Sequence, residues 1–138
     1  MKQPEDIKRE FTRQWIEKAE RDYNASNHLL SEEGMYLEAA AFHAQQAAEK
    51  YFKALLVWSQ IEFPKTHDIN LLLTLLSNLQ PDISVILAEA ATLTPYGVEY
   101  RYPGDYPDVT REDAAEAFEI ASRVRQAVLQ SLPKDVFL

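Results

Sequence analysis

Apolar residues recur every three or four positions along most of the chain, which is the spacing of a buried helix face. The first such stripe predicts a helix from about Asp6 to Leu30. A second helix is predicted from about Tyr36 to Gln60, and it is apolar around most of its circumference. It is therefore expected to be the most buried helix. The first stripe comprises Phe11, Trp15, Ala19, Tyr23, Ser26 and Leu30, and the core face of the second helix comprises Ala40, Ala44, Ala47, Tyr51, Leu55 and Trp58.

Two shorter helices are expected after the second long one. Thr66 is a suitable N-cap for a helix that reaches Leu79, and Pro81 separates it from another helix over about Asp82 to Leu93. The stretch from Thr94 to Asp108 is rich in proline, glycine and tyrosine. Such aromatic loops usually lie against the body of a protein, so we expect an ordered surface strap.

A last long helix is predicted after a capping box, in which Thr110 is followed three residues later by Asp113. Together these elements predict an all-α fold, an up-and-down antiparallel helix bundle of four long helices plus a shorter helix. The length of 138 residues suits one domain over residues 1–138, with a core over about 11–132. The apolar face of the last helix comprises Ala114, Ala117, Phe118, Ala121, Val124, Val128 and Leu132.

The charge balance limits the partners that the chain can attract. It has 22 acidic and 14 basic residues, for a formal net charge of -8. This field repels polyanions, so we expect no non-specific nucleic-acid binding. A local cationic pocket for one or a few phosphates is still compatible with this charge, because nearby groups outweigh distant ones at short range.

Several classes of site and location are excluded by residue content. The absence of cysteine rules out disulfides and thiolate metal sites, and no Glu-x-x-His pair is present, so we expect no metal and no cofactor. No apolar run reaches the roughly 18 residues that a membrane span needs, and the first ten residues lack the apolar core of a signal peptide. We therefore expect a cytoplasmic protein.

Candidate chemistry is concentrated on the second predicted helix. His43, Gln46, Lys50 and Lys53 recur at spacings of three, four and three, which places them along one stripe, and Glu49 borders it. A polar stripe on an apolar helix either faces solvent or meets partners, because burying unpaired charge is costly. Both interpretations, a solvated edge and a ligand or partner surface, are compatible with the spacing.

Two further polar clusters follow along the chain. His67 stands beside Asp68 at a predicted helix start, where a capping arrangement competes with a catalytic pair. Arg101 is flanked by Tyr100 and Tyr102, so its guanidinium can stack and pair within the fold or present a fork to a phosphate.

These three pieces together resemble the signature of HEPN domains, the higher eukaryotes and prokaryotes nucleotide-binding family. They are the run AFHAQQAAEKYFKALL at 41–56, then KTHD at 65–68 and YRYP at 100–103. The resemblance covers roughly Trp15 to Leu132, and the combination in this order is specific.

The resemblance implies a bundle of four long helices plus a shorter one, commonly a homodimer. It also implies a partner, since such proteins are encoded in prokaryotes beside a small nucleotidyltransferase as a two-component, toxin–antitoxin-like pair. The positions that match the family's polar signature are His43, Gln46, Lys50, Lys53, His67 and Arg101, and Tyr102 beside them is a candidate to stack on a base.

We therefore expect a non-catalytic HEPN protein that pairs with a nucleotidyltransferase and binds a nucleotide phosphate. One alternative is a HEPN ribonuclease toxin, which would need an arginine and a histidine separated by four to six residues near the last helix. No histidine follows His67, and the only such spacing joins Arg21 to His28 on the first helix, so enzymatic activity is not expected. Another alternative is a structural homodimeric interaction module.

Overall fold

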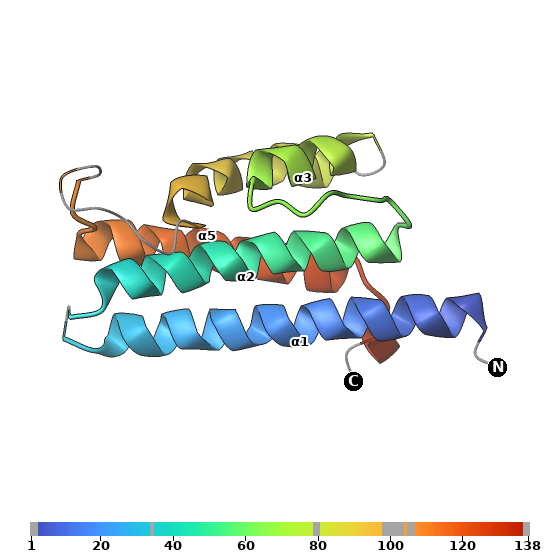
Figure 1. Ribbon diagram of the computed structural model, residues 1–138, viewed down its shortest axis with the longest axis horizontal. Helices are drawn as coiled ribbons and strands as arrows, with labels where there is room; N and C mark the ends of the chain where they lie inside the picture. The colour runs from blue at the N-terminus through green and yellow to red at the C-terminus, as the bar shows by residue number, and fades with distance from the viewer. Residues whose placement is uncertain (1–2, 34, 79–80, 98–103, 105–106, 137–138) are drawn as a thin grey trace.

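The computed structural model describes residues 3–33, 35–78, 81–97, 104 and 107–136, and the regular structure within them is helical. Three long helices dominate, α1 (Pro4–Ser31), α2 (Leu37–Trp58) and α5 (Arg111–Gln130). In Figure 1 the chain runs one way along α1, returns along α2, and follows α5 in the same direction as α2. The shorter helices α3 (Ile69–Ser77), α4 (Pro81–Ile86) and the 3₁₀ helix η1 (Ala88–Gly97) cover α2 on the side away from α1. The predicted all-α helix bundle is confirmed.

The central helix is α2, which packs against α1, α5, α3 and η1. Its residues are buried without a break from Ala44 to Glu49 and again from Tyr51 to Leu56. The alanines let neighbouring helices approach closely, whereas Tyr51 and Phe52 fill the core with fully buried rings. The predicted core face is confirmed, except that Trp58 at the helix end is only partly buried.

Helix α1 begins at a proline, which has no backbone N–H to leave unpaired in the first turn, and Glu5 and Asp6 there suit the positive end of the helix dipole. One member of its predicted stripe is misplaced. Phe11 is 52% exposed, and the buried positions of this part are Thr12 and Ile16. Thr12 tolerates this burial because its hydroxyl donates to the Lys8 carbonyl, so the polar group needs no solvent.

The predicted helix over 66–79 is shorter and is capped by a different residue. Helix α3 begins at Ile69, and its N-cap is Asp68, whose carboxylate accepts a hydrogen bond from the Asn70 N–H. Thr66 instead accepts from the Asp68 N–H, which fixes the turn that leads into the helix. Because α3 begins at Ile69, Asp68 holds the N-cap position and Thr66 lies two residues before it.

The fourth predicted helix, over 82–93, is not one continuous α-helix. After α4 the chain tightens into η1, and Leu87 just before it is buried together with Ala90 and Leu93 of η1, at a spacing of three. A 3₁₀ helix has three residues per turn, so this spacing keeps all three side chains on the core side. The expected strap over 94–108 begins within η1, and most of its remaining residues lie outside the described part of the chain.

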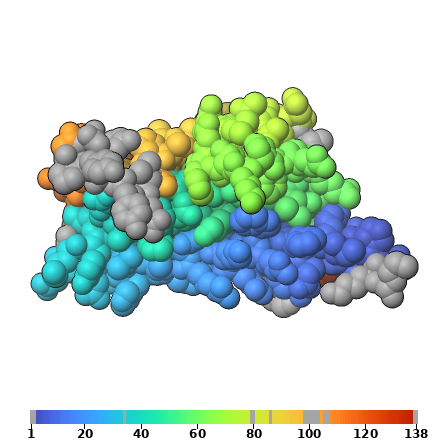
Figure 2. Space-filling model, viewed as in Figure 1, coloured from blue at the N-terminus to red at the C-terminus, as the bar shows by residue number. Residues whose placement is uncertain are grey.

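Helix α5 has the capping box expected from the sequence. The Thr110 hydroxyl accepts from the Asp113 N–H, and the Asp113 carboxylate accepts from the Thr110 N–H. Beyond α5 the short 3₁₀ turn η2 (Lys134–Val136) lies against α1 and buries Val136. The space-filling view shows α1 and α3 on opposite edges of one face of the molecule, with α2 between them (Figure 2). None of the helices in the described ranges is both long enough and apolar enough to cross a bilayer.

Candidate functional site

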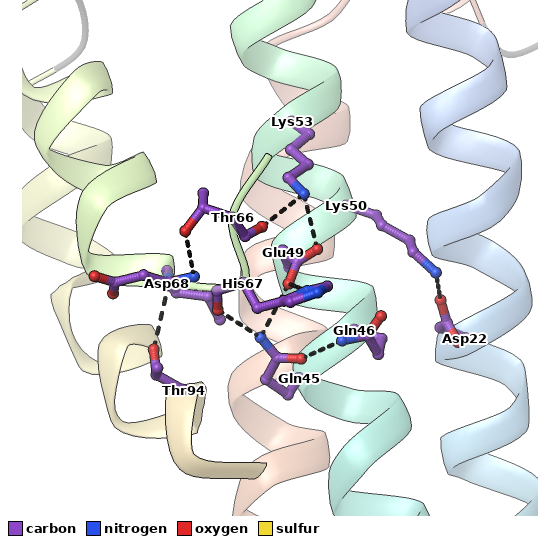
Figure 3. Close-up of polar contacts among 11 residues, drawn as sticks. Asp22, Gln45, Gln46, Glu49, Lys50, Lys53, Thr66, His67, Asp68 and Thr94 are labelled. Carbon is purple, nitrogen blue, oxygen red and sulfur yellow. Dashed lines mark hydrogen bonds and ion pairs between the residues drawn. The ribbon is translucent and has the colours of Figure 1, made fainter. Parts of the chain in front are cut away.

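A buried carboxylate, Glu49, is the centre of the polar cluster on α2. Its side chain is 2% exposed. Lys53 Nζ lies 2.9 Å from Glu49 Oε2, and His67 Nδ1 lies 2.9 Å from Glu49 Oε1 (Figure 3). The Lys53 ammonium also donates to the Thr66 carbonyl over 2.8 Å. The cluster therefore ties α2 to the segment that precedes α3, and it compensates a charge that would be costly to bury alone.

Local structure explains why these side chains meet. Glu49 and Lys53 are one helical turn apart, which is the spacing that brings side chains together on a helix. After α2 the chain turns at Gln60, which has a φ of 59°, and then runs back along the helix toward α3. This return places Thr66 and His67 beside the Glu49 side chain.

Two buried amides extend the cluster into the core. Gln45 Nε2 donates to Glu49 Oε1 over 3.3 Å and to the His67 carbonyl over 3.2 Å. Gln46 Nε2 donates to Gln45 Oε1 over 2.7 Å. Gln46, one of the predicted site residues, therefore orients the Gln45 amide that holds Glu49 and His67 (Figure 3).

The other two predicted residues on α2 point toward α1. His43 Nδ1 lies 2.8 Å from Asp22 Oδ1, and the Lys50 ammonium is paired with the other oxygen of the same carboxylate. Figure 3 shows Lys50 reaching α1 on the side of α2 away from His67. The predicted stripe is thus divided between two carboxylates, and its cations meet partners within the fold instead of forming a solvated edge.

A surface pocket opens beside the Glu49 cluster. It has a volume of about 360 Å³ and lies between α1 and the segment before α3. Lys53 stands 5.3 Å from the centre of the Trp15 ring and 5.9 Å from that of Phe63. Lys65 is exposed and makes no ion pair within the described residues. The pocket lining comprises Trp15, Lys53, Phe63, Pro64, Lys65, Thr66 and His67.

The structure thus brings Lys53 and His67 together and places His43 and Lys50 elsewhere. Arg101 and Tyr102 lie outside the described residues. Sequence reasoning noted Glu49 only as a neighbour of the stripe and missed Asp22 and Gln45. The signal for Glu49 was its spacing of four from Lys53 on a helix that is otherwise apolar, whereas nothing in the sequence pairs Asp22 with Lys50.

Comparison with known proteins shows the family of the chain. A family model for the HEPN domain matches residues 12–132. The chain belongs to the HEPN domain family. It is similar to TT1696 from Thermus thermophilus, with 31% identity and a TM-score of 0.70, over 88% of this chain and 98% of that one. It is also similar to ST0689, an archaeal HEPN homologue, with 32% identity and a TM-score of 0.67, over 87% of this chain and 96% of that one. The search of curated proteins gave no match.

A second polar network of this HEPN domain links α1, α2 and α5. Glu20 accepts hydrogen bonds from the Arg125 guanidinium, at 2.7 Å from Nε, and from the Tyr51 hydroxyl. Burial opposes ionisation of Glu20, but the hydrogen bonds from Arg125 and Tyr51 outweigh it, so the pKa of this carboxyl is below its usual value. Burial and the adjacent carboxylate raise the pKa of the Tyr51 phenol. The network is thus a charged Glu20–Arg125 pair with a neutral tyrosine.

The described residues of the HEPN domain contain no group of three metal-ligating side chains placed to hold an ion. The chemistry that they offer beside the pocket is a lysine pair, a histidine and two aromatic rings. Such a set suits an anion attached to a planar ring, because ammonium groups neutralise phosphate and aromatic side chains stack on bases.

Proposed function

We propose that this HEPN domain is the non-catalytic partner of a small nucleotidyltransferase in a cytoplasmic, toxin–antitoxin-like pair, and that it acts as a homodimer. Membership of the HEPN family supports the pairing, because the resemblance to that family implies a nucleotidyltransferase encoded beside the chain. Partner binding also suits a chain with a net charge of -8 better than direct contact with nucleic acid.

We further propose that the pocket beside Glu49 binds a nucleotide phosphate. The single observation that carries this proposal is the convergence of Lys53, Lys65 and His67 on one pocket with Trp15 and Phe63. Lys53 is already paired with Glu49, so Lys65 supplies the uncompensated charge and His67 a hydrogen bond. Arg101 and Tyr102, which are also expected from the sequence to bind the nucleotide, lie outside the described residues.

The positions of the histidines support a non-catalytic role. His43 and His67 each have Nδ1 against a carboxylate that also pairs with a lysine. His28, the histidine spaced from Arg21 in the ribonuclease manner, is exposed, and its nearest charged partner is Glu32 at 3.7 Å. Within the described residues none of these three histidines contacts an arginine, so the arginine–histidine pair that the ribonuclease alternative needs is not formed there.

Isothermal calorimetry with AMP, ADP and ATP, each with and without magnesium, tests the phosphate site. We expect saturable binding that weakens about tenfold when Lys65→Ala removes a phosphate contact worth roughly 1.4 kcal/mol. Lys134→Ala is the matched control, because Lys134 is an exposed lysine in η2 and lies outside the pocket lining. Equal affinities for Lys65→Ala and the native chain would refute the assigned site.

Co-expression with an adjacent nucleotidyltransferase tests the pairing separately. A tagged copy of this chain is expected to co-purify with the enzyme as one complex, with a mass measured by light scattering that equals a defined ratio of the two chains. Elution of the two proteins as separate species at micromolar concentration would contradict the partnership.

A further inference from the structure

An open groove runs between α1 and α5, on the side of the bundle where these helices contact each other less than either contacts α2. Two adjoining hollows of about 460 and 620 Å³ form it, and both are lined by Arg125 and Leu129. Ile16 and Leu132 add apolar surface to the floor. The groove therefore combines an apolar floor with charged edges, which is the composition of many protein interfaces.

Some charged side chains along the groove have partners among the described residues, and others form no ion pair there. Arg125 is paired with Glu20, and Arg13 donates to the backbone carbonyl of Val136. Glu17 and Arg21 are both exposed, and neither forms an ion pair within the described residues. They lie one turn apart on α1 and line the same hollow. Lys134 adds a further cation at the α5 end.

An acid and a base at this spacing form a self-complementary pair under two-fold symmetry. In a two-fold dimer, a contact from residue i to residue j is repeated from j to i. If α1 meets α1 of a second copy in the antiparallel direction, with the axis at the level of Ala19, Glu17 of each copy faces Arg21 of the other. Both unpaired charges are then satisfied twice.

We propose that the α1–α5 groove is the homodimer interface and that α1 of a second copy of this chain occupies it. This inference rests on the homodimer proposed above and names its surface. The net charge of the chain explains why this surface is favoured for dimerisation. Two chains of charge -8 repel each other, so association needs a face where opposite charges alternate. The alternation of Arg13, Glu17 and Arg21 along α1 supplies it, and the second α1 covers the half-buried Leu129.

Charge reversal with sedimentation equilibrium tests the proposal. The native chain is expected to dimerise, and Glu17→Arg and Arg21→Glu are each expected to raise the dimer Kd at least about tenfold, because each places two like-charge contacts in the interface. The double variant carrying both reversals restores opposite charges across the axis, so its Kd should return to within about threefold of the native value. Glu116→Arg, at an exposed position of α5 outside the groove lining, is the matched control and should leave the Kd unchanged.

The outcomes separate the two proposals. A monomer of the native chain at all concentrations would overturn both the homodimer and this interface. A dimer whose Kd is the same in the native chain and in both single variants would overturn this interface alone. Single variants that weaken the dimer without recovery in the double variant would overturn the reciprocal Glu17–Arg21 contact. Far-ultraviolet circular dichroism of each variant, unchanged from that of the native chain, establishes that a loss of dimer is not a loss of fold.

Discussion

Glu49 and Lys53 are a charged pair in the most buried helix, with side chains 2% and 8% exposed. Removing one member of such a pair leaves the other charge in a medium that solvates it poorly. The hydrogen bonds from His67 and Gln45 add to this dependence, since both side chains are oriented by the Glu49 carboxylate. Stability and the shape of the pocket therefore depend on the same few atoms.

Lys53→Ala is accordingly expected to lower the free energy of unfolding by about 3 kcal/mol, because it strands the Glu49 charge. Urea denaturation followed by circular dichroism measures the change. Lys65→Ala is the matched control, since this lysine is exposed and makes no ion pair with any residue that the structure describes, and its effect should stay within about 0.5 kcal/mol. A loss for Lys53→Ala as small as that for Lys65→Ala would show that the Glu49–Lys53 pair adds little to the free energy of unfolding.

Glu20 makes stability depend on pH in the acid range. Its pKa is below the usual value of 4.5, so the folded state holds the charged form more tightly than the unfolded state does. The resulting stabilisation is fully present above pH 4.5 and is lost as the pH falls through the folded-state pKa. We expect Glu20→Gln to be less stable than the native chain near neutral pH and to lose less stability between neutral pH and pH 3.

Thermal unfolding of native protein, Glu20→Gln and Tyr51→Phe at a series of pH values measures this difference. Tyr51→Phe keeps the Arg125 pair and removes one hydrogen bond to the carboxylate, so its decline in acid should be intermediate. Parallel stability curves for all three proteins would mean that Glu20 does not carry the acid dependence.

At the scale of secondary structure, η1 reaches the site through its last residue. A Cβ placed on Gly97 would lie 2.8 Å from Gln45 Cδ, closer than side chains approach each other. The Gln45 side chain is fully buried and donates to both Glu49 and the His67 carbonyl, so it has little room to yield. The close approach of η1 to α2 thus requires glycine at this position.

Gly97→Ala is expected to destabilise the fold by about 1–3 kcal/mol through overpacking and to weaken nucleotide binding, because the Gln45 amide must move away from His67. Gln45→Ala introduced into the same chain makes space for the methyl group. A double-mutant cycle measured by denaturation should therefore show a favourable coupling between the two substitutions. If the free-energy losses of the two substitutions simply add, the destabilisation by Gly97→Ala does not arise from a clash with Gln45.

The sequence predicted the elements that are formed by contacts between residues close together in the chain, and it missed features that depend on distant contacts. Helices α1, α2 and α5 follow from local periodicity and, for α5, from a capping box whose two members are three residues apart. The 3₁₀ helix η1 was expected to be α-helical, although the spacing of three between Leu87, Ala90 and Leu93 was visible. The Thr94 hydroxyl accepts from the Ile69 N–H, a contact that no local pattern contains.

The same limit applies to the candidate site. The sequence predicted Lys53 and His67 as site residues, because both match the polar signature of the HEPN family. It could not separate them from Lys50 and His43, since the carboxylate that holds those two is contributed by α1, 21 residues from His43 along the chain. Which cation meets which carboxylate is decided by helix packing, and a single-helix pattern does not contain that packing.

At the scale of the whole molecule, net charge and local charge predict different ligands. The total of -8 opposes any extended polyanion, whereas the Lys53–Lys65 pocket attracts one compact anion. A nucleic-acid backbone spans many residues of the surface and meets the overall negative field, but a mononucleotide meets only the pocket.

The chain is therefore expected to bind a labelled 20-base RNA more weakly than about 10⁻⁴ M even at low salt, where electrostatic attraction to nucleic acid would be greatest. Fluorescence anisotropy measures this affinity, and gel analysis of the same RNA after prolonged incubation should show it intact. Replacing the exposed Glu116 and Glu119 by lysine reduces the negative field without touching the pocket, and it should strengthen RNA binding while leaving nucleotide affinity unchanged. Tight binding of RNA by the native chain that weakens with Lys65→Ala would instead mean that the pocket receives a phosphate of a polynucleotide, and cleavage of that RNA would favour the ribonuclease alternative over a non-catalytic partner.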